Sequence, residues 1–201
     1  MDALIEELRR YVADERVLDA IAAVPREHFV PWPLRDRAYE NRALSIGCGQ
    51  TISQPLVVAR MTELLTLRPE DRVLDVGTGS GYHAAVLARL AGHVWSIERH
   101  ERLSERAGRN LEAAGVGNVT LIVGDGTRGL PDEAPFDAIN VAAAGTAEWL
   151  EELEAQLGPE GRLVAPVTDP LQRLAVTRRT PGGLERALFE EVRFVPLVRD
   201  G

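Results

Sequence analysis

Cysteine is nearly missing from this chain of 201 residues. It holds one, Cys48, so no disulfide can form within the chain. Long apolar runs are missing too, since none approaches the roughly 18 residues that a membrane-spanning helix needs. The first ten residues, MDALIEELRR, lack the basic start and apolar centre of a secretory signal. These absences predict a cytoplasmic protein that does not enter the membrane.

Blocks of positive charge are also lacking. Lys and Arg number 23 against 31 Asp and Glu, which gives a formal net charge of −8. Such a surface repels the phosphates of nucleic acids and anionic lipids. We therefore expect neither nucleic acid nor membrane as a partner. No apolar helix pattern indicates an obligate dimer, so the expected state is a monomer.

Several common enzyme motifs are absent. The chain has no Gly-Lys-Ser/Thr phosphate loop, and its histidines show no H-E-x-x-H or other tight ligand spacing. Ser80 is not at a nucleophile elbow, because the residue two before it is Thr78 and not glycine. We expect no metal site and no serine-hydrolase chemistry.

What is present after the first 55 residues is a regular alternation of strand and helix patterns. Strand patterns cover residues 72–76, 93–98, 119–125, 136–143 and 161–167, and helix patterns cover 82–91, 101–115 and 147–157. This order is typical of βαβ units around a parallel sheet. Two more strand patterns, 171–179 and 187–198, flank a Pro-Gly-Gly turn. The predicted fold is therefore α/β: a Rossmann-like, doubly wound, mostly parallel sheet with helices on both faces and an antiparallel C-terminal edge hairpin.

The N-terminal part has a different pattern. Short amphipathic helices are predicted at residues 2–12 and 16–23, and VPREHFVPWP then interrupts helicity with three prolines. A further helix is expected from Pro55. We predict one domain, residues 1–201, in which residues 1–55 form a helical lid or wall on the α/β core of residues 56–201.

A glycine loop follows the first core strand. Asp75 lies near the end of that strand, and GTGSG at residues 77–81 opens the next helix. Glycines there let the backbone turn tightly and let a ligand approach the main chain. Glu98, at the end of the next strand, can accept hydrogen bonds from both hydroxyls of a ribose. Asp125, in VGDG, can accept from an adenine amino group, although Asp-Gly is also a common turn.

A second notable stretch is GCGQTISQP, residues 47–55, which lies about twenty residues before the glycine loop. It is small and polar and has no acid or base. Ser53 has two interpretations, an active-site hydroxyl or the N-cap of the following helix, and the two are compatible.

These segments together resemble a known family. The segments are VPREHFVP, AYENRALSIGCGQTISQP, VLDVGTGSGYHAAVLA, VWSIER, VGDGTRGLPDEAPFDAINVAAA and FVPLV. From about Val24 to Val198 the chain resembles the S-adenosylmethionine-dependent methyltransferases and, among them, the protein-L-isoaspartate O-methyltransferase family of protein-repair enzymes. The glycine loop is general to the class, whereas GQTISQP is specific to the family.

The resemblance implies a site for S-adenosyl-L-methionine, which would leave as S-adenosyl-L-homocysteine. The implied cofactor residues are Asp75, Gly77, Thr78, Gly79, Ser80, Gly81, Glu98, Arg99, Asp125 and Gly126. The implied catalytic residues are Ser53 and Thr51. The implied substrate-binding residues are Gln50, Ile52, Gln54 and His83.

The implied reaction is methyl transfer to the α-carboxylate of L-isoaspartyl residues in damaged proteins and peptides. That carboxylate is already ionised at neutral pH, so the reaction needs no strong base. The segment GTAEW departs from the family pattern. It leaves open the alternative that the protein is a relative of this family that methylates Asp in a dedicated peptide, which then forms an aspartimide. A cofactor-binding module without catalysis and an NAD oxidoreductase are further alternatives, and the G-x-G-x-G spacing disfavours the latter.

Overall fold

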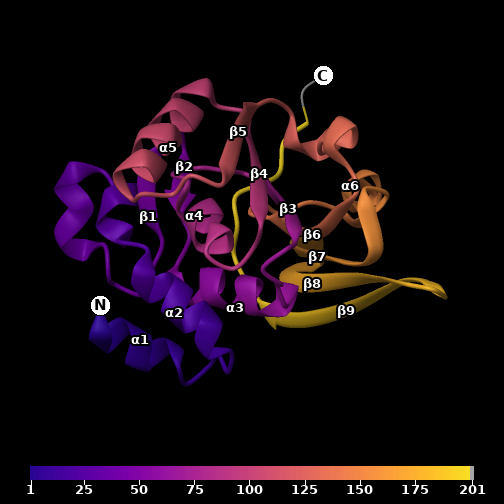
Figure 1. Ribbon diagram of the computed structural model, residues 1–201, viewed down its shortest axis with the longest axis horizontal. Helices are drawn as coiled ribbons and strands as arrows, with labels where there is room; N and C mark the ends of the chain where they lie inside the picture. The colour runs from indigo at the N-terminus through magenta and orange to yellow at the C-terminus, as the bar shows by residue number, and fades with distance from the viewer. Residues whose placement is uncertain (200–201) are drawn as a thin grey trace.

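The computed structural model describes residues 1–199, apart from the side chains of two residues, 147 and 169. A seven-stranded sheet with the order β5-β4-β3-β6-β7-β8-β9 forms its centre (Figure 1). Its strands are β3 (Arg72–Val76), β4 (His93–Glu98), β5 (Val119–Val123), β6 (Phe136–Val141), β7 (Leu157–Asp169), β8 (Leu171–Thr180) and β9 (Gly183–Glu191).

The sheet confirms the predicted fold class. Strands β5, β4, β3, β6 and β7 run parallel, whereas β8 pairs antiparallel with both β7 and β9. The order of the strands along the chain reverses between β3 and β6. In open α/β sheets a ligand binds at such a point, beyond the carboxyl ends of the strands.

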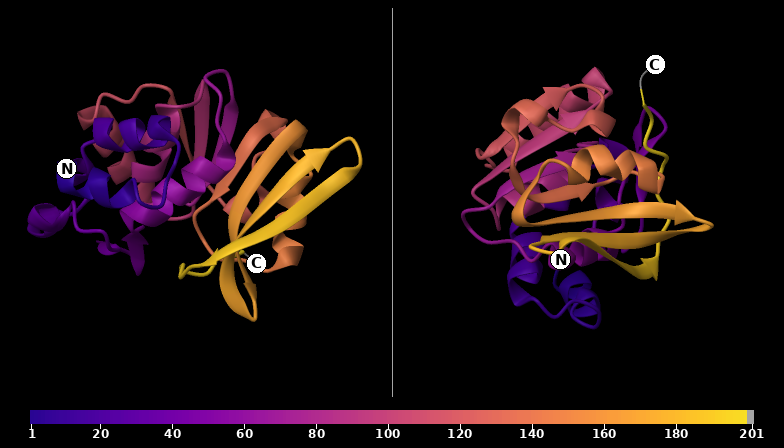
Figure 2. Two further views of the ribbon diagram at one scale, coloured as in Figure 1. Left: turned by 90° about the horizontal axis from the view of Figure 1, so that it is seen from below. Right: turned by 90° about the vertical axis from the view of Figure 1, so that its right-hand side faces the viewer.

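Helices cover both faces of the sheet. They are α1 (Asp2–Leu8), α2 (Glu15–Ala23), α3 (Pro55–Leu65), α4 (Tyr82–Ala88), α5 (Glu101–Ala113) and α6 (Ala147–Glu154). Val73 of β3 packs in one apolar cluster with residues of α3 and α4, whereas its neighbour Leu74 packs in another with residues of α6. Successive side chains of a strand point to opposite faces, which explains this division. In the left view of Figure 2 the helices from the first part of the chain lie on one side of the sheet and α6, in orange, lies on the other.

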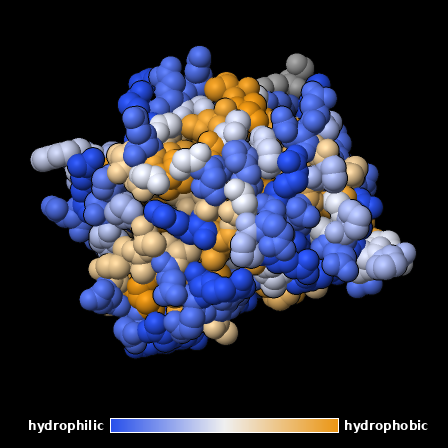
Figure 3. Space-filling view, viewed as in Figure 1, coloured by the Kyte–Doolittle hydropathy of each residue, from blue (hydrophilic) through white to orange (hydrophobic). Residues whose placement is uncertain are grey.

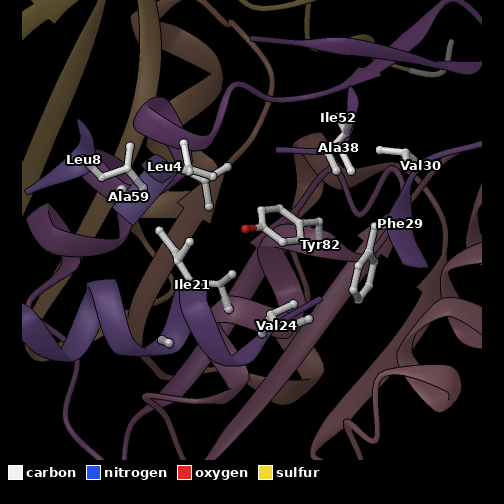
Figure 4. Packing of buried hydrophobic residues seen from close by; sticks show 14 of the residues in the cluster. Leu4, Leu8, Ile21, Val24, Phe29, Val30, Ala38, Ile52, Ala59 and Tyr82 are labelled. Atoms are coloured by element: carbon white, nitrogen blue, oxygen red, sulfur yellow. The ribbon is translucent and has the colours of Figure 1, made fainter. Parts of the chain in front are cut away.

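The N-terminal helices pack on the core of the protein. Leu8 of α1 and Ile21 of α2 share an apolar cluster with Tyr82 of α4 (Figure 4). Two short 3-10 helices follow, η1 (Arg26–Phe29) and η2 (Trp32–Arg37), where the sequence has its prolines. The first helix is shorter than the predicted 2–12, because the chain turns after Leu8.

The predicted strand 187–198 is wrong in its second half. Strand β9 ends at Glu191, and residues 192–199, here called the C-terminal segment, turn back across the carboxyl edge of the sheet (Figure 1). Ala144 N donates to Val195 O at 2.8 Å, and Leu197 N donates to Ala144 O at 2.7 Å. Leu197 is buried in the cluster that contains residues of α6. Pro196 lacks the N–H that a continuing strand would need, which favours this departure from β9.

Polar side chains dominate the face seen in Figure 3, and a small apolar area lies over the carboxyl end of β5, where Val123 is exposed. None of the helices in the described part of the chain is long and apolar enough to cross a membrane.

Candidate active site

The glycine loop joins β3 to α4 and is fastened to the end of β4. Gly77, Gly79 and Gly81 all have positive φ, which explains the residue type at these positions. Gly77 N and Thr78 N both donate to Ile97 O, at 2.9 and 3.3 Å. The loop is therefore preformed.

Glu98 ties the loop to the start of α5. Its Oε2 accepts from Gly79 N at 2.8 Å and its Oε1 accepts from His100 N at 2.9 Å. The side chain is buried, yet it borders the cavity between this loop and residues 50–53, here called the site cavity. A carboxylate oxygen can accept more than one hydrogen bond, so Glu98 can hold the loop and also bind a ribose.

Asp75 lies behind the cavity wall. It accepts hydrogen bonds from Ser96 Oγ and Asn140 Nδ2, each at 2.7 Å, and Thr78 Oγ1 lies 2.6 Å from Ser96 Oγ. Burial raises the pKa of the Asp75 carboxyl to about 6, against these hydrogen bonds, which lower it. The resemblance implies that Asp75 helps to build the cofactor pocket. Asp75 does not itself line the cavity but positions the loop through Ser96 and Thr78, and its role toward the cofactor stays a prediction.

His83 continues this buried polar network. Its Nδ1 lies 3.1 Å from Asn140 Nδ2, and its Nε2 lies 3.2 Å from Thr62 Oγ1. Because Asn140 Nδ2 can only donate, Nδ1 is the accepting nitrogen and the proton is on Nε2. Burial lowers the pKa of His83 to about 3, so the ring is neutral. His83 also borders the cavity, and its role in substrate binding stays a prediction.

Asp125 and Gly126, which follow the end of β5, form the third part of the candidate site. Asp125 Oδ1 accepts from Thr127 N and Thr127 Oγ1, at 2.9 and 2.7 Å, and so caps the 3-10 helix η3 (Gly126–Arg128). A second 3-10 helix, η4 (Pro131–Glu133), follows. Gly126 borders the cavity, and a Cβ there would lie 2.6 Å from Val76 Cγ1. The turn interpretation of Asp125 is confirmed, and its contact with adenine stays a prediction.

The stretch GCGQTISQP folds as a β-hairpin. Strands β1 (Leu44–Gly47) and β2 (Gln50–Ile52) pair antiparallel across a two-residue turn. The turn residues Cys48 and Gly49 have φ of 54° and 70°, as a type I′ turn requires. The hairpin places its second strand opposite the glycine loop.

Ser53 is not the N-cap of α3. The N-cap is Gln54, whose side chain makes no capping bond, and Asn41 Oδ1 accepts from Leu56 N at 3.0 Å instead. The cap interpretation of Ser53 is therefore wrong. The preceding segment supplies this hydrogen bond, which leaves the Ser53 hydroxyl for another partner.

The hairpin and the glycine loop share one cavity. Its lining includes most of the predicted site: Gln50, Thr51, Ile52, Ser53, Gly77, Thr78, Gly79, Ser80, His83, Glu98, Arg99 and Gly126. Gly81 is not on this wall, because a Cβ there would lie 3.2 Å from Ala107 of α5. Gln54 instead lines an adjoining cavity together with Thr51 and Ser53.

Sequence reasoning missed the C-terminal segment as part of the site. Residues 195–198 line the site cavity, and residues 191–195 line the adjoining one. FVPLV was part of the family resemblance, but its apolar residues carry no chemical signal, so no role was assigned to it.

The described residues suit a nucleoside cofactor and offer no cluster for a metal. The glycine loop lets a ligand approach its backbone, the Glu98 carboxylate can bind a ribose, and a side chain at position 126 would fill the cavity wall. These three features meet where the order of the strands reverses, between β3 and β6. Within residues 1–199, no group of three or more His, Cys, Asp or Glu side chains could hold a metal ion. Fold and site together define a Rossmann-like, S-adenosylmethionine-dependent methyltransferase.

Comparison with known proteins identifies the family. The model of the protein-L-isoaspartate(D-aspartate) O-methyltransferase (PCMT) family matches residues 1–201. The protein-L-isoaspartate O-methyltransferase of Klebsiella pneumoniae (strain 342) is 52% identical over 200 residues, which are 99% of this chain and 96% of that protein. That of Methylorubrum extorquens (strain PA1) is 54% identical over 192 residues, 94% of this chain and 83% of that protein. The chain belongs to the protein-L-isoaspartate(D-aspartate) O-methyltransferase family.

Solved structures support the assignment to this family. A protein-L-isoaspartate O-methyltransferase superposes with a TM-score of 0.86 at 32% identity, over 97% of this chain and 65% of the other. A protein of Plasmodium falciparum assigned to the same enzymes, in complex with S-adenosyl-L-homocysteine, has a TM-score of 0.85 at 25% identity and 98% coverage of both chains.

Proposed function

We propose that this protein transfers a methyl group from S-adenosyl-L-methionine to the α-carboxylate of L-isoaspartyl residues in damaged proteins and peptides, which initiates their repair. One observation carries the proposal: Thr51 and Ser53 of the family-specific hairpin face the glycine loop across a single cavity. Cofactor and acceptor would therefore meet between two preformed elements.

The bound cofactor supplies the methyl group on a positively charged sulfur. We assign Glu98 to the ribose and the backbone of residues 77–80 to the rest of the cofactor, with Gly126 beside the adenine. The loop backbone at residues 77–79 is fixed by hydrogen bonds to β4. A preformed site needs no reorganisation during the reaction.

The acceptor side needs positioning more than acid–base chemistry. An isoaspartyl carboxylate is ionised at neutral pH, so it is a nucleophile without a base. In the proposed mechanism the hydroxyls of Ser53 and Thr51 donate to one carboxylate oxygen and direct the other at the methyl group. Positioning of this kind lowers barriers by up to roughly 7–11 kcal/mol in ideal cases.

The adjoining cavity suits the peptide on either side of the reacting residue. Thr51, Ser53 and Gln54 form one wall and residues 191–195 the other. We assign this cavity to the substrate main chain, with Gln50 and Gln54 at the rims. Backbone recognition would allow isoaspartyl sites in many sequences to react.

One assay tests the proposal. The protein is incubated with labelled S-adenosyl-L-methionine and either an isoaspartyl peptide or the same peptide with Asp, and base-labile methanol is measured. We expect release from the isoaspartyl peptide alone. Release from neither peptide would refute the proposal, and release from the Asp peptide alone would support the dedicated-peptide alternative.

The remaining expectations stay predictions. They are the monomeric state, the cytoplasmic location and the absence of nucleic-acid and membrane partners. Sedimentation of the purified protein at several concentrations would test the first of these.

A further inference from the structure

Arg26 of η1 is a fully buried arginine beneath the hairpin that carries the predicted catalytic hydroxyls. Its Nε donates to Ala38 O at 2.8 Å, and its Nη2 donates to Ser53 O at 2.9 Å. The guanidinium carbon lies 4.8 Å from the centre of the Tyr82 ring. Figure 4 shows that ring beside Phe29, Ala38 and Ile52.

The positive charge of Arg26 has no negative partner among the described residues. The ion pairs within residues 1–199 do not include it. Its buried Nη1 makes no hydrogen bond of good geometry there, and the group that interacts with the guanidinium is the neutral hydroxyl of Tyr82. Glu27, next in sequence, accepts instead from the Tyr39 hydroxyl. Burial lowers the pKa of Arg26 to about 10, so the side chain is still a cation at neutral pH.

A buried charge without a counter-ion is costly, and proteins normally pair it. Arg162, the other buried arginine among residues 1–199, follows this rule and pairs with Asp71. Arg26 has no such partner, and it bonds to the backbone oxygen of Ser53, the residue whose hydroxyl is proposed to bind the substrate. The substrate brings a carboxylate to that hydroxyl.

We propose that Arg26 is a positioning residue for the methyl acceptor: it fixes the main chain of Ser53, and its unpaired charge attracts the substrate carboxylate to the Ser53 hydroxyl. This inference rests on the proposed function. The guanidinium acts from behind Ser53 and makes no direct contact with the carboxylate, so the reacting oxygen keeps its lone pairs. The substrate serves as the counter-ion that the folded chain lacks.

The test compares a charged and a neutral ligand of one shape. The probes are an isoaspartyl peptide and its analogue with the α-carboxylate replaced by a carboxamide, each titrated by calorimetry in the presence of S-adenosyl-L-homocysteine. For Arg26→Met we expect the Kd of the carboxylate peptide to rise about tenfold or more. The Kd of the carboxamide peptide and that of S-adenosyl-L-homocysteine should change less than about twofold.

Two further variants separate charge from anchoring. Arg26→Lys keeps the charge and should keep most of the preference for the carboxylate peptide. Arg106→Met removes a half-buried arginine that donates to Ile46 O, at 2.7 Å, in the same hairpin, and should leave the preference unchanged. If Arg26→Met does not fold, Arg26→Gln retains a donor in place of the guanidinium and allows the same comparison.

If Arg26→Met or Arg26→Gln loses the same affinity for both peptides, the inference is overturned. Arg26 would then only hold the main chain of Ser53 in place. The proposed function is judged separately, by whether the unaltered protein methylates the isoaspartyl peptide. A protein that methylates it but shows equal losses would retain its function and refute the role of Arg26.

Discussion

At the level of single residues, the two sides of the cavity have different chemistry. The cofactor side has a carboxylate, Glu98, and the backbone of the glycine loop. The acceptor side has the uncharged side chains of Gln50, Thr51 and Ser53. Hydroxyls orient an anion without removing its charge, which suits a reaction whose nucleophile arrives ionised.

Replacing Ser53 by alanine should reduce turnover about ten- to a hundredfold, since a hydrogen bond to a charged group is worth roughly 1.5–3 kcal/mol. The affinity for S-adenosyl-L-homocysteine, measured by calorimetry, should hardly change. Ser45→Ala, at an exposed position of β1, is the matched control and should have no effect. A parallel loss of cofactor affinity would mean that Ser53 is structural.

His83 gives the stability of the protein a dependence on pH. Its pKa falls from 6.5 to about 3 on folding, so the unfolded chain takes up a proton first and stability falls as the pH drops below about 6.5. Asp75 acts in the opposite direction, because its pKa rises from 3.8 to about 6 and stability falls as the pH rises through that range.

His83→Gln removes the first effect and leaves the second. Relative to the unaltered protein, the variant should gain about 1.4 kcal/mol of unfolding free energy for each pH unit below about 6.5, down to about pH 4. Urea unfolding at pH 7, 6 and 5 measures this. A difference between the two proteins that is the same at all three pH values would contradict the assignment of a neutral His83.

The residues of the candidate site could be predicted from the sequence where they belong to one motif. Gly77, Gly79 and Glu98 follow from strand ends and spacing. Ser96, Asn140 and Thr62 were missed because they lie on three separate elements, and only the fold brings them to Asp75 and His83. Arg26 was missed as well, since nothing in VPREHFVP shows that its guanidinium lies beneath Ser53.

At the level of elements, the β1–β2 hairpin decides the geometry of the acceptor side. Its two-residue turn pairs Gly47 with Gln50, and a β-bulge between Ser45 and Gly47 then shifts the register, so that Ser45 pairs with Thr51 and Leu44 with Ile52. A change of one residue in this register would turn Thr51 to the opposite face. Cys48 is exposed at the turn and has a left-handed backbone conformation, which is unfavourable for most L-residues.

Cys48→Asn should therefore stabilise the protein by roughly 0.5–1 kcal/mol, because Asn-Gly is the preferred pair for this turn. Turnover should be retained, since the Cys48 side chain does not line the cavity. Thermal unfolding measures the gain, and Cys48→Val, with its branched side chain, should lower the melting temperature instead. If both variants melt alike, the turn is not strained.

Core strands β3 and β4 were predicted to the residue, because each is a short, mostly apolar run rich in residues that favour strands and is bounded by turn signals. The end of β9 was not. FVPLV has a strand composition, but the burial of Leu197 against α6 and the hydrogen bonds to Ala144 outweigh local preference. Such long-range contacts are not visible in a single sequence.

At the level of the whole molecule, we propose that residues 1–201 act as a single methyltransferase domain. Residues of α1, α2, η1 and the β1–β2 hairpin share one apolar cluster with residues of α4 and α5. In this proposal residues 1–55 supply the acceptor wall and residues 56–201 hold the cofactor. Unfolding in urea should then follow one transition by fluorescence and by circular dichroism, and two separate transitions would refute it.

The C-terminal segment should matter more to activity than to folding. A chain ended after Arg193 loses the hydrogen bonds to Ala144 and the wall at residues 195–198. We expect it to fold with a lower melting temperature, to bind S-adenosyl-L-homocysteine at least about tenfold more weakly, and to lack measurable turnover. A chain ended after Val198 keeps that wall and serves as the control. Full activity in the shorter chain would show that the segment is dispensable.

The return of the C-terminal segment to the cavity also orders events during synthesis. A domain generally folds as a unit, and this one closes its cavity with residues from near the end of the chain. If residues 1–201 are a single domain, a nascent chain that still lacks residues 195–198 has no enclosed cavity. We therefore expect it to gain its activity only after the last strand of the sheet has left the ribosome.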